Sequence, residues 1–111
     1  MSEYELTIIQ RAKDDIIDIG DYITYKLLAP DISLHFIKNL KNAIQQLKFF
    51  SCKFPLVQDE YLKQLEIRCM PYKNYYIFYE VSENGKMVIV SRIGYYRRDW
   101  EKILKCKSLQ E

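Results

Sequence analysis

Residues Glu66–Leu104 read E-I-R-C-M-P-Y-K-N-Y-Y-I-F-Y-E-V-S-E-N-G-K-M-V-I-V-S-R-I-G-Y-Y-R-R-D-W-E-K-I-L, and this stretch predicts three strands followed by a short helix. Apolar side chains alternate over Gln64–Met70, which is the pattern of a strand with one buried face, and Pro71 ends it. Tyr75–Val81 is apolar on both sides, as expected of a strand inside a sheet.

A tight turn and a glycine delimit the third strand. The Asn84-Gly85 pair favours a hairpin turn, so Lys86–Ile93 should return antiparallel to the strand before it. Gly94 ends that strand. The helix predicted over Arg97–Leu104 carries apolar residues at helical spacing, namely Trp100, Ile103 and Leu104.

The first half of the chain predicts one strand and two helices. Tyr4–Gln10 is rich in β-formers and indicates a strand. Arg11–Leu27 and a segment from Pro30 to about Phe50 each carry an apolar stripe, and Pro30 suits a first helical turn. The first stripe consists of Ile16, Ile19, Ile23 and Leu27, and the second of Phe36, Ile37, Leu40, Ile44 and Leu47.

The predicted order is therefore strand, helix, helix, strand, strand, strand, helix, within a single domain of residues 1–111. This order indicates an α+β fold. We expect an antiparallel sheet with the N-terminal helix hairpin packed on one face and a short C-terminal helix that covers part of the other.

Composition excludes several classes of protein. An apolar content of 49% argues against a disordered chain. No leader and no run of about 18 apolar residues is visible, so we expect a cytoplasmic protein with no membrane partner. We expect neither a metal nor a cofactor, because the three cysteines (Cys52, Cys69 and Cys106) are far apart and His35 is the sole histidine.

Charge is distributed unevenly along the chain. Residues 1–61 carry seven Lys/Arg and nine Asp/Glu, whereas residues 62–107 carry ten Lys/Arg and five Asp/Glu. A basic second half suits an anionic partner such as nucleic acid or an acidic polypeptide, although a solubilising surface would look the same. The acidic row Asp14, Asp18 and Asp21 is interpreted as a solvated helix face.

Strand periodicity separates the candidate functional side chains from those that pack. If Leu65 and Ile67 face the helix hairpin, Arg68 faces the free side of the sheet. The candidate set on this free side combines arginine forks that match phosphate with tyrosine rings that stack on bases. It consists of Arg68, Tyr76, Arg92, Tyr96, Arg97 and Arg98, with Lys73 at a loop rim. The alternative is that most tyrosines pack and that Arg97 only solvates a helix start.

The whole pattern resembles the RelE/ParE superfamily of bacterial toxins. The resemblance covers Tyr4 to about Leu104. Its most specific part is Ile93–Trp100, I-G-Y-Y-R-R-D-W, which is similar to the G-x-R-R-D-W ending of such toxins. The N-terminal pattern A-x-x-D-I-x-x-I-x-x-Y-I fits as well, with Ala12, Asp15, Ile16, Ile19, Tyr22 and Ile23.

This resemblance implies a toxin of a type II system that is neutralised by a cognate antitoxin. RelE-like members cut mRNA on the ribosome, and ParE-like members poison DNA gyrase without known nuclease chemistry. We expect growth inhibition by ribosome-dependent mRNA cleavage. The alternatives are a gyrase-poisoning toxin or a degenerate member that binds its antitoxin and is not toxic.

The resemblance also implies site residues. The set expected to be catalytic is Arg68, Tyr76, Tyr96, Arg97 and Arg98, with Lys73, Arg92 and Tyr95 binding substrate. Cleavage requires a base, positive charge on the phosphate and an acid for the leaving oxygen. Tyr96 would be the acid, and Glu66 is the candidate base. Tyr76 stands where RelE-like nucleases carry an arginine, which favours the gyrase alternative.

Overall fold

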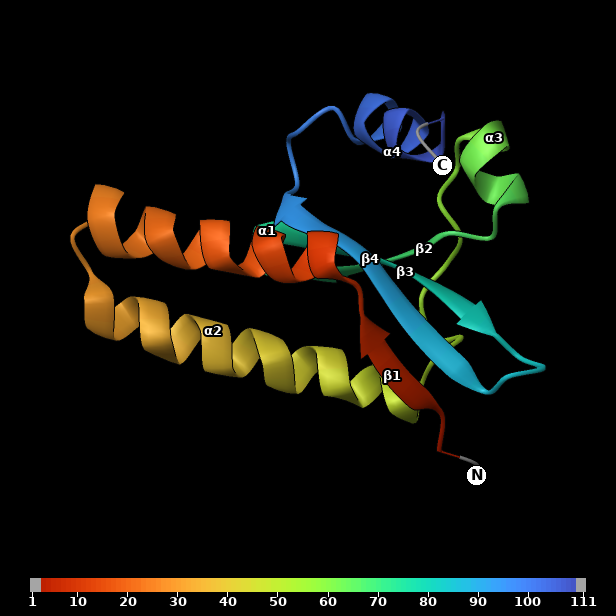
Figure 1. Ribbon diagram of the computed structural model, residues 1–111, viewed down its shortest axis with the longest axis horizontal. Helices are drawn as coiled ribbons and strands as arrows, with labels where there is room; N and C mark the ends of the chain where they lie inside the picture. The colour runs from red at the N-terminus through yellow and green to blue at the C-terminus, as the bar shows by residue number, and fades with distance from the viewer. Residues whose placement is uncertain (1–2, 110–111) are drawn as a thin grey trace.

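The computed structural model describes residues 3–109, with side chains described up to Lys105. A four-stranded sheet lies between a long helix hairpin on one face and two short helices on the other (Figure 1). The helices are α1 (Gln10–Asp21), a π-helical turn (Tyr22–Lys26), α2 (Pro30–Gln45), a 3-10 turn (Gln46–Lys48), α3 (Glu60–Gln64) and α4 (Trp100–Leu109). The strands are β1 (Glu5–Ile8), β2 (Arg68–Tyr72), β3 (Tyr75–Ser82) and β4 (Met87–Tyr95).

The α+β prediction is confirmed, but the sheet is mixed rather than wholly antiparallel. Its strand order is β1-β4-β3-β2, and β1 pairs parallel to β4 while the other two pairs are antiparallel. The two local pairs follow from short turns, which the sequence reveals. The β1–β4 pair joins residues about 80 positions apart, and periodicity within a strand carries no information on such a partner's direction.

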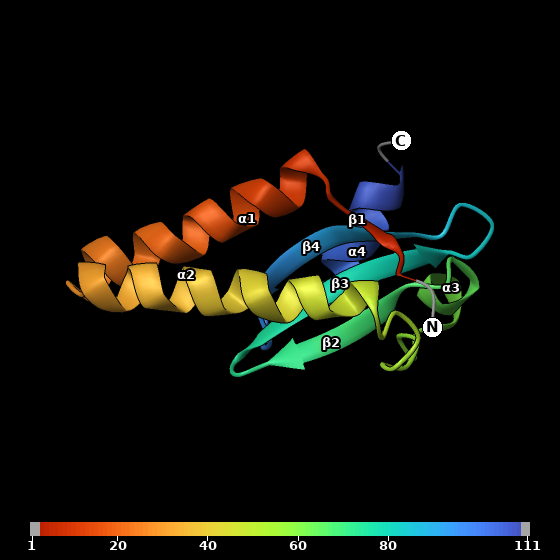
Figure 2. The same cartoon turned by 90° about the horizontal axis from the view of Figure 1, so that it is seen from below.

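Each face of the sheet has its own hydrophobic core. The hairpin core combines helix residues Ala12, Ile16, Ile19, Ile23, Leu40, Ile44 and Leu47 with sheet residues Met70, Ile77, Tyr79, Val88, Val90 and Ile93. The opposite core, which we call the α4 core, consists of Leu62, Ile67, Phe78, Trp100 and Leu104. Figure 2 shows the hairpin reaching well beyond the sheet, so that at its far end the two helices lie against each other and not on the sheet.

The two long helices bury most of their predicted stripes, except Leu27, which is 56% exposed, and both helices end earlier than predicted. Pro30 occupies the first turn of α2 and Asp31 follows it, as expected. After Asp21 the chain widens into a π-helical turn, and Leu28 adopts a positive φ of 52° that closes the link to α2. Helix ends depend on such tertiary links rather than on the apolar period.

The predicted strand Gln64–Met70 is the clearest local error. In the structure α3 ends at Gln64, residues 65–67 form no strand, and β2 begins at Arg68 and runs through Pro71 to Tyr72. The side chain of Asp59 accepts a hydrogen bond from Leu62 N and thereby caps a short helix. Glu66 then turns the chain with a positive φ of 58°. Ile67 consequently faces the α4 core, so the two faces of β2 are exchanged relative to the prediction.

A bulge in β4 changes which side chains face the hairpin. The register shifts between Phe78 and Tyr79, so that Phe78 pairs with Arg92 while Tyr79 pairs with Val90. The extra residue is Ser91, whose hydroxyl donates to Phe78 O at 3.1 Å. Because of this insertion, Arg92 lies on the α4 side of the sheet instead of the hairpin side.

Buried Tyr79 and half-buried Cys69 predict a loss of stability at alkaline pH. Burial raises the pKa of Tyr79 from 10.0 to about 12 and that of the Cys69 thiol from 9.0 to about 12. The unfolded chain ionises both groups first, so the stability they contribute is complete below about pH 9 and is lost as the pH rises to about 12. Thermal melts between pH 7 and 11 should show a Tm that falls only above about pH 9.

Tyr79→Phe is the control for this alkaline fall. The Tyr79 hydroxyl donates to Ser51 O at 2.9 Å, so the variant should melt at a lower temperature at pH 7. It should then lose less Tm between pH 9 and 11 than the parent chain does. A parent Tm that stays constant to pH 11 would show that these groups ionise equally in both states.

Candidate functional site

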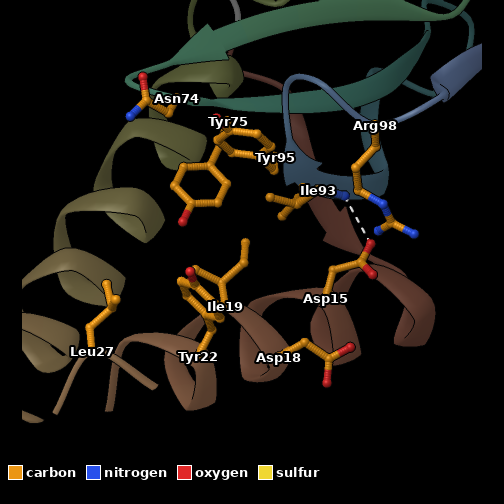
Figure 3. Close-up of a pocket in the computed structure, with 11 residues that line it drawn as sticks. Asp15, Asp18, Ile19, Tyr22, Leu27, Asn74, Tyr75, Ile93, Tyr95 and Arg98 are labelled. Atoms are coloured by element: carbon orange, nitrogen blue, oxygen red, sulfur yellow. Dashed lines mark hydrogen bonds between the residues drawn. The ribbon is translucent and has the colours of Figure 1, made fainter. Parts of the chain in front are cut away.

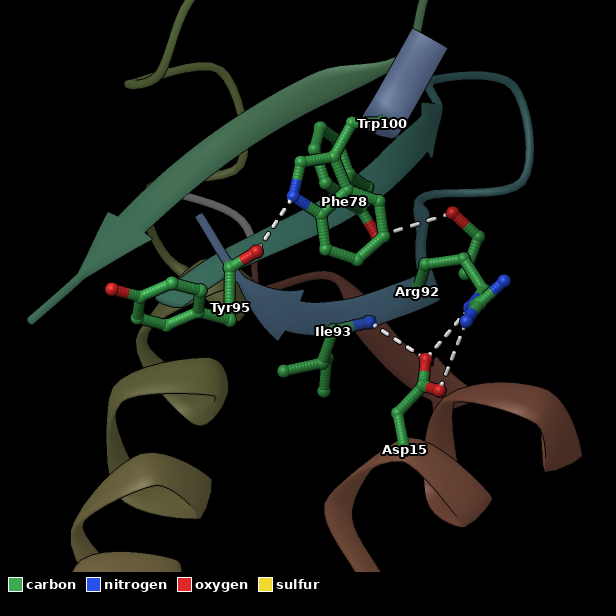
Figure 4. Close-up of polar contacts among 7 residues, drawn as sticks. Asp15, Phe78, Arg92, Ile93, Tyr95 and Trp100 are labelled. Carbon is green, nitrogen blue, oxygen red and sulfur yellow. Dashed lines mark hydrogen bonds and ion pairs between the residues drawn. The ribbon is translucent and has the colours of Figure 1, made fainter. Parts of the chain in front are cut away.

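A buried ion pair joins α1 to β4 (Figure 4). Arg92 Nε donates to Asp15 Oδ2 at 2.8 Å and Nη2 donates to Oδ1 at 3.2 Å. Ile93 N donates to the same carboxylate at 2.9 Å. Asp15 is 6% exposed and Arg92 is 4% exposed. Arg92 therefore lies on the α4 side of the sheet, the face predicted for it, but it is buried as a structural cation and is not free to bind a substrate.

Sequence reasoning missed Asp15 as the partner of Arg92. The position of Asp15 could have indicated that it is buried, because it lies within the apolar stripe of α1, between Ala12 and Ile19. An acidic residue on a buried helical face needs a partner. The row Asp14, Asp18 and Asp21 is exposed, as predicted for a solvated face.

Arg68 lies apart from the other candidate residues. It pairs with Tyr79 on the hairpin side of the sheet, and its Nη1 donates to Phe54 O at 2.6 Å. Tyr76 pairs with Pro71, three residues farther along β2, which is roughly 10 Å at strand spacing. Tyr76 also packs with the α4 core on the other face. Glu66, the candidate base, lines a pocket with Arg68 rather than with Tyr76.

The remaining candidates gather where β3 begins and β4 ends. Tyr76 and Tyr96 pack ring against ring at 6.0 Å, and Tyr95 and Tyr96 at 5.1 Å. Arg97 Nε donates to the Tyr96 hydroxyl at 2.7 Å. Arg98 lies with its guanidinium 5.4 Å from the centre of the Trp100 ring. We call these five residues, Tyr76, Tyr95, Tyr96, Arg97 and Arg98, the sheet-end group.

Lys73 borders the sheet-end group on its hairpin side. It turns the chain between β2 and β3 with a positive φ of 52°. Its ammonium nitrogen lies 5.9 Å from the Phe36 ring centre and 5.8 Å from that of Tyr72. This agrees with its predicted place at a loop rim.

A pocket of about 580 Å³ opens beside this group, between α1 and the sheet (Figure 3). Its walls include Tyr22, Tyr75 and Tyr95, and Asp18 and Arg98 supply opposite charges to its lining. Burial raises the pKa of Tyr75, and the neighbouring phenols of Tyr22 and Tyr95 add to that shift. The pocket can therefore hold a flat or apolar group with charged groups nearby.

Two kinds of site were sought in the part of the chain that the structure describes, namely a cluster of metal ligands and a membrane-spanning helix. No three His, Cys, Asp or Glu side chains among the described residues are placed to hold a metal ion. No described helix is both long and apolar enough to cross a bilayer. Cys52 and Cys69 are free thiols, and the Cys106 side chain lies outside the described residues.

Comparison with known proteins identifies the family. The model of the ParE toxin of type II toxin–antitoxin systems, parDE, matches residues 6–100. The chain belongs to the ParE toxin family. Sequence comparison with curated proteins returned no significant match.

Solved structures of related toxins share the ParE fold at low identity. A chain of the chromosomal ParDE system from P. aeruginosa superposes with a TM-score of 0.69 at 17% identity, covering 84% of this chain and 96% of that one. A chain of the M. tuberculosis RelBE2 complex superposes with a TM-score of 0.60 at 13% identity, covering 88% of this chain and 97% of that one. The isolated E. coli RelE toxin superposes with a TM-score of 0.55 at 15% identity, covering 96% of this chain and 98% of that one.

The motif that carried the family resemblance has a structural role in this ParE-family chain. A Cβ at Gly94 would lie 2.7 Å from Trp100 Cη2, so the indole ring requires a glycine there. Trp100 Nε1 also donates to Tyr95 O at 2.9 Å. Asp99 caps α4, because its side chain accepts from Lys102 N at 3.3 Å. These contacts hold the start of α4 against the end of β4, next to the sheet-end group.

Proposed function

We propose that this ParE-family toxin inhibits growth by poisoning DNA gyrase and that it has no nuclease activity. The match to the ParE family model over residues 6–100 carries the proposal. The dispersal of the expected cleavage residues supports it. Arg92 is buried in an ion pair with Asp15. Arg68 and Glu66 lie near the opposite end of the strands from Tyr96.

In-line cleavage of RNA requires a base, a cation and an acid around one phosphate. The sheet-end group offers cations and phenols, whereas Glu66 as the candidate base stands apart from it. Asp99, next to Arg98 in sequence, is engaged as a helix cap. Ribosome-dependent mRNA cleavage is therefore the less favoured function.

A cognate antitoxin is the partner that we propose for the far end of the helix hairpin. ParDE and RelBE are toxin–antitoxin systems in the related structures. The hairpin of this chain exposes large apolar side chains that a monomer would normally bury. They are Tyr22, Tyr25, Leu27, Leu28, Ile32 and Leu34. A partly disordered antitoxin segment that folds on binding could cover such a surface.

The decisive experiment compares two targets with one toxin preparation. Purified toxin added to gyrase and relaxed plasmid should block supercoiling and accumulate cleaved DNA, and equimolar antitoxin should restore supercoiling. The same toxin added to programmed ribosomes should leave the message intact by primer extension. Normal gyrase activity at large toxin excess would refute the proposal, and cleaved message would restore the nuclease function. Harmless induction in cells without antitoxin would indicate a degenerate member.

A further inference from the structure

The aromatic rings around the end of the sheet form an unbroken series that neither core requires in full. Tyr75 contacts Tyr95 at 6.3 Å, Tyr95 contacts Tyr96 at 5.1 Å, and Tyr96 contacts Tyr76 at 6.0 Å between ring centres. The series passes from the hairpin side of the sheet to the α4 side. Tyr95 in its middle is 45% exposed, so at least one ring is open to a ligand.

Three cations lie near these rings and form no ion pair with a carboxylate of the described residues. The ion pairs formed among the described residues are Arg92–Asp15 and Lys105–Asp59, so they leave out Lys73, Arg97 and Arg98. The Arg97 guanidinium is held by the Tyr96 hydroxyl and lies 5.3 Å from the Tyr96 ring centre. This contact pre-orients a planar fork of donors next to an aromatic ring.

The 580 Å³ pocket continues the same surface inward (Figure 3). Tyr75 and Tyr95 form an aromatic wall, and Arg98 lies within reach of an anionic group at the pocket. Asn74 and Asp18 supply amide and carboxylate groups that can hydrogen-bond to the edge of a base. The volume lies in the range of small-molecule sites, so it accommodates a base with its sugar.

We propose that this surface binds single-stranded nucleic acid without cleaving it. One unstacked base enters the pocket against Tyr75 and Tyr95, and the next base stacks on Tyr96. Arg97, Arg98 and Lys73 contact the phosphates. This inference deepens the proposed function, since a gyrase poison that also holds the strand opened on its target would contact protein and DNA together.

A protein segment fits this surface less well than it fits the hairpin end. Exposed aliphatic side chains at the hairpin end, among them Leu27, Leu28 and Leu34, suit a protein partner. The sheet end instead offers rings and unpaired cations, the combination used to bind single strands by stacking and by charge. The two surfaces therefore suit different classes of partner.

Fluorescence anisotropy with purified toxin and labelled 12-nucleotide strands tests the inference. The probes are oligo-dT, oligo-rU and a DNA duplex of the same length. Either single strand should bind more tightly than the duplex, and the two single strands together show whether DNA or RNA is preferred. Tyr95→Ala should weaken single-strand binding by about 5- to 150-fold. Arg97→Ala should weaken it and reduce the slope of log affinity against log salt by about 0.7.

Matched controls come from the hairpin. Tyr25→Ala removes a ring that is 72% exposed, and Lys41→Gln removes an exposed cation on α2. Both should leave binding within about 2-fold of the parent chain. Tyr95→Phe should retain most of the affinity, because it keeps the ring.

Three results would overturn the inference. They are absence of binding to both single strands at low salt, equal binding to duplex, and an affinity that Tyr95→Ala leaves unchanged. Protection of Tyr95 by the antitoxin with no oligonucleotide binding would assign the surface to a protein instead. None of these results bears on gyrase inhibition, so the proposed function stands or falls by its own assay.

Discussion

Replacing Asp15 with alanine is expected to lower the free energy of unfolding by about 3–5 kcal/mol. The change leaves the Arg92 guanidinium, 4% exposed, with a buried charge and no carboxylate. It also removes the acceptor of Ile93 N. For a chain of this size such a loss is a large part of the total stability. Urea unfolding followed by circular dichroism would measure it, and a large fraction of the variant should be unfolded during expression.

The neighbouring acid Asp18 provides the matched control. It lies on the same helix in an exposed position, so Asp18→Ala should change stability by less than about 0.5 kcal/mol. A double variant that combines Asp15→Leu with Arg92→Met should recover most of the loss, since apolar packing can substitute for a buried ion pair. An Asp15→Ala chain as stable as the parent would mean that water reaches Arg92.

The helix hairpin and the β3–β4 hairpin were predictable because their signals are local. An apolar stripe gives a helix, and the Asn84-Gly85 pair correctly indicated a hairpin, although its loop is four residues long (83–86) and the left-handed residue is Lys86. The β2 error had the opposite origin. Alternation over Gln64–Met70 resembled a strand, but the turn at Glu66 places Ile67 in the α4 core against residues that are distant in sequence.

The candidate site was predicted in part for the same reason. Tyr76, Tyr95, Tyr96, Arg97 and Arg98 are close in sequence or on paired strands, and the structure brings them together. The errors involve Arg68 and Arg92. The face exchange at β2 separates Arg68 from the group, and Arg92, which the bulge at Ser91 places on the α4 side of the sheet, is buried in an ion pair with Asp15. Residue types and periods do not encode a bulge or a partner 77 positions away.

The two hydrophobic cores also differ in the number of buried side chains that stabilise them. Among the described residues the hairpin core contains thirteen buried side chains and the α4 core five. A small core with few buried apolar groups opens at lower free energy than the rest of the molecule. The helix α4 is therefore expected to unfold locally before the sheet does, and Trp100 is the residue on which this depends.

Trp100→Ala is expected to destabilise the packing of α4 by about 3–5 kcal/mol, as for other buried aromatic truncations. The indole ring packs on Phe78 at 4.7 Å, covers Gly94 and donates to Tyr95 O. After its loss, Leu104 and the partly buried Ile103 would hold the helix in the core, helped by the partly exposed Lys105–Asp59 ion pair. Amide hydrogen exchange should rise first in α4, while α1 and β4 stay protected.

Two further variants separate packing from hydrogen bonding at Trp100. Trp100→Phe keeps a ring over Phe78 but removes the donor to Tyr95 O, so it should lose roughly 1–3 kcal/mol. Gly94→Ala keeps the indole but places a methyl group 2.7 Å from it, and should lose about 1–3 kcal/mol by displacing the ring. If α4 exchanged as slowly in Trp100→Ala as in the parent chain, the helix would be held by its other contacts. In that case the glycine and tryptophan of the family motif would serve something other than the attachment of α4.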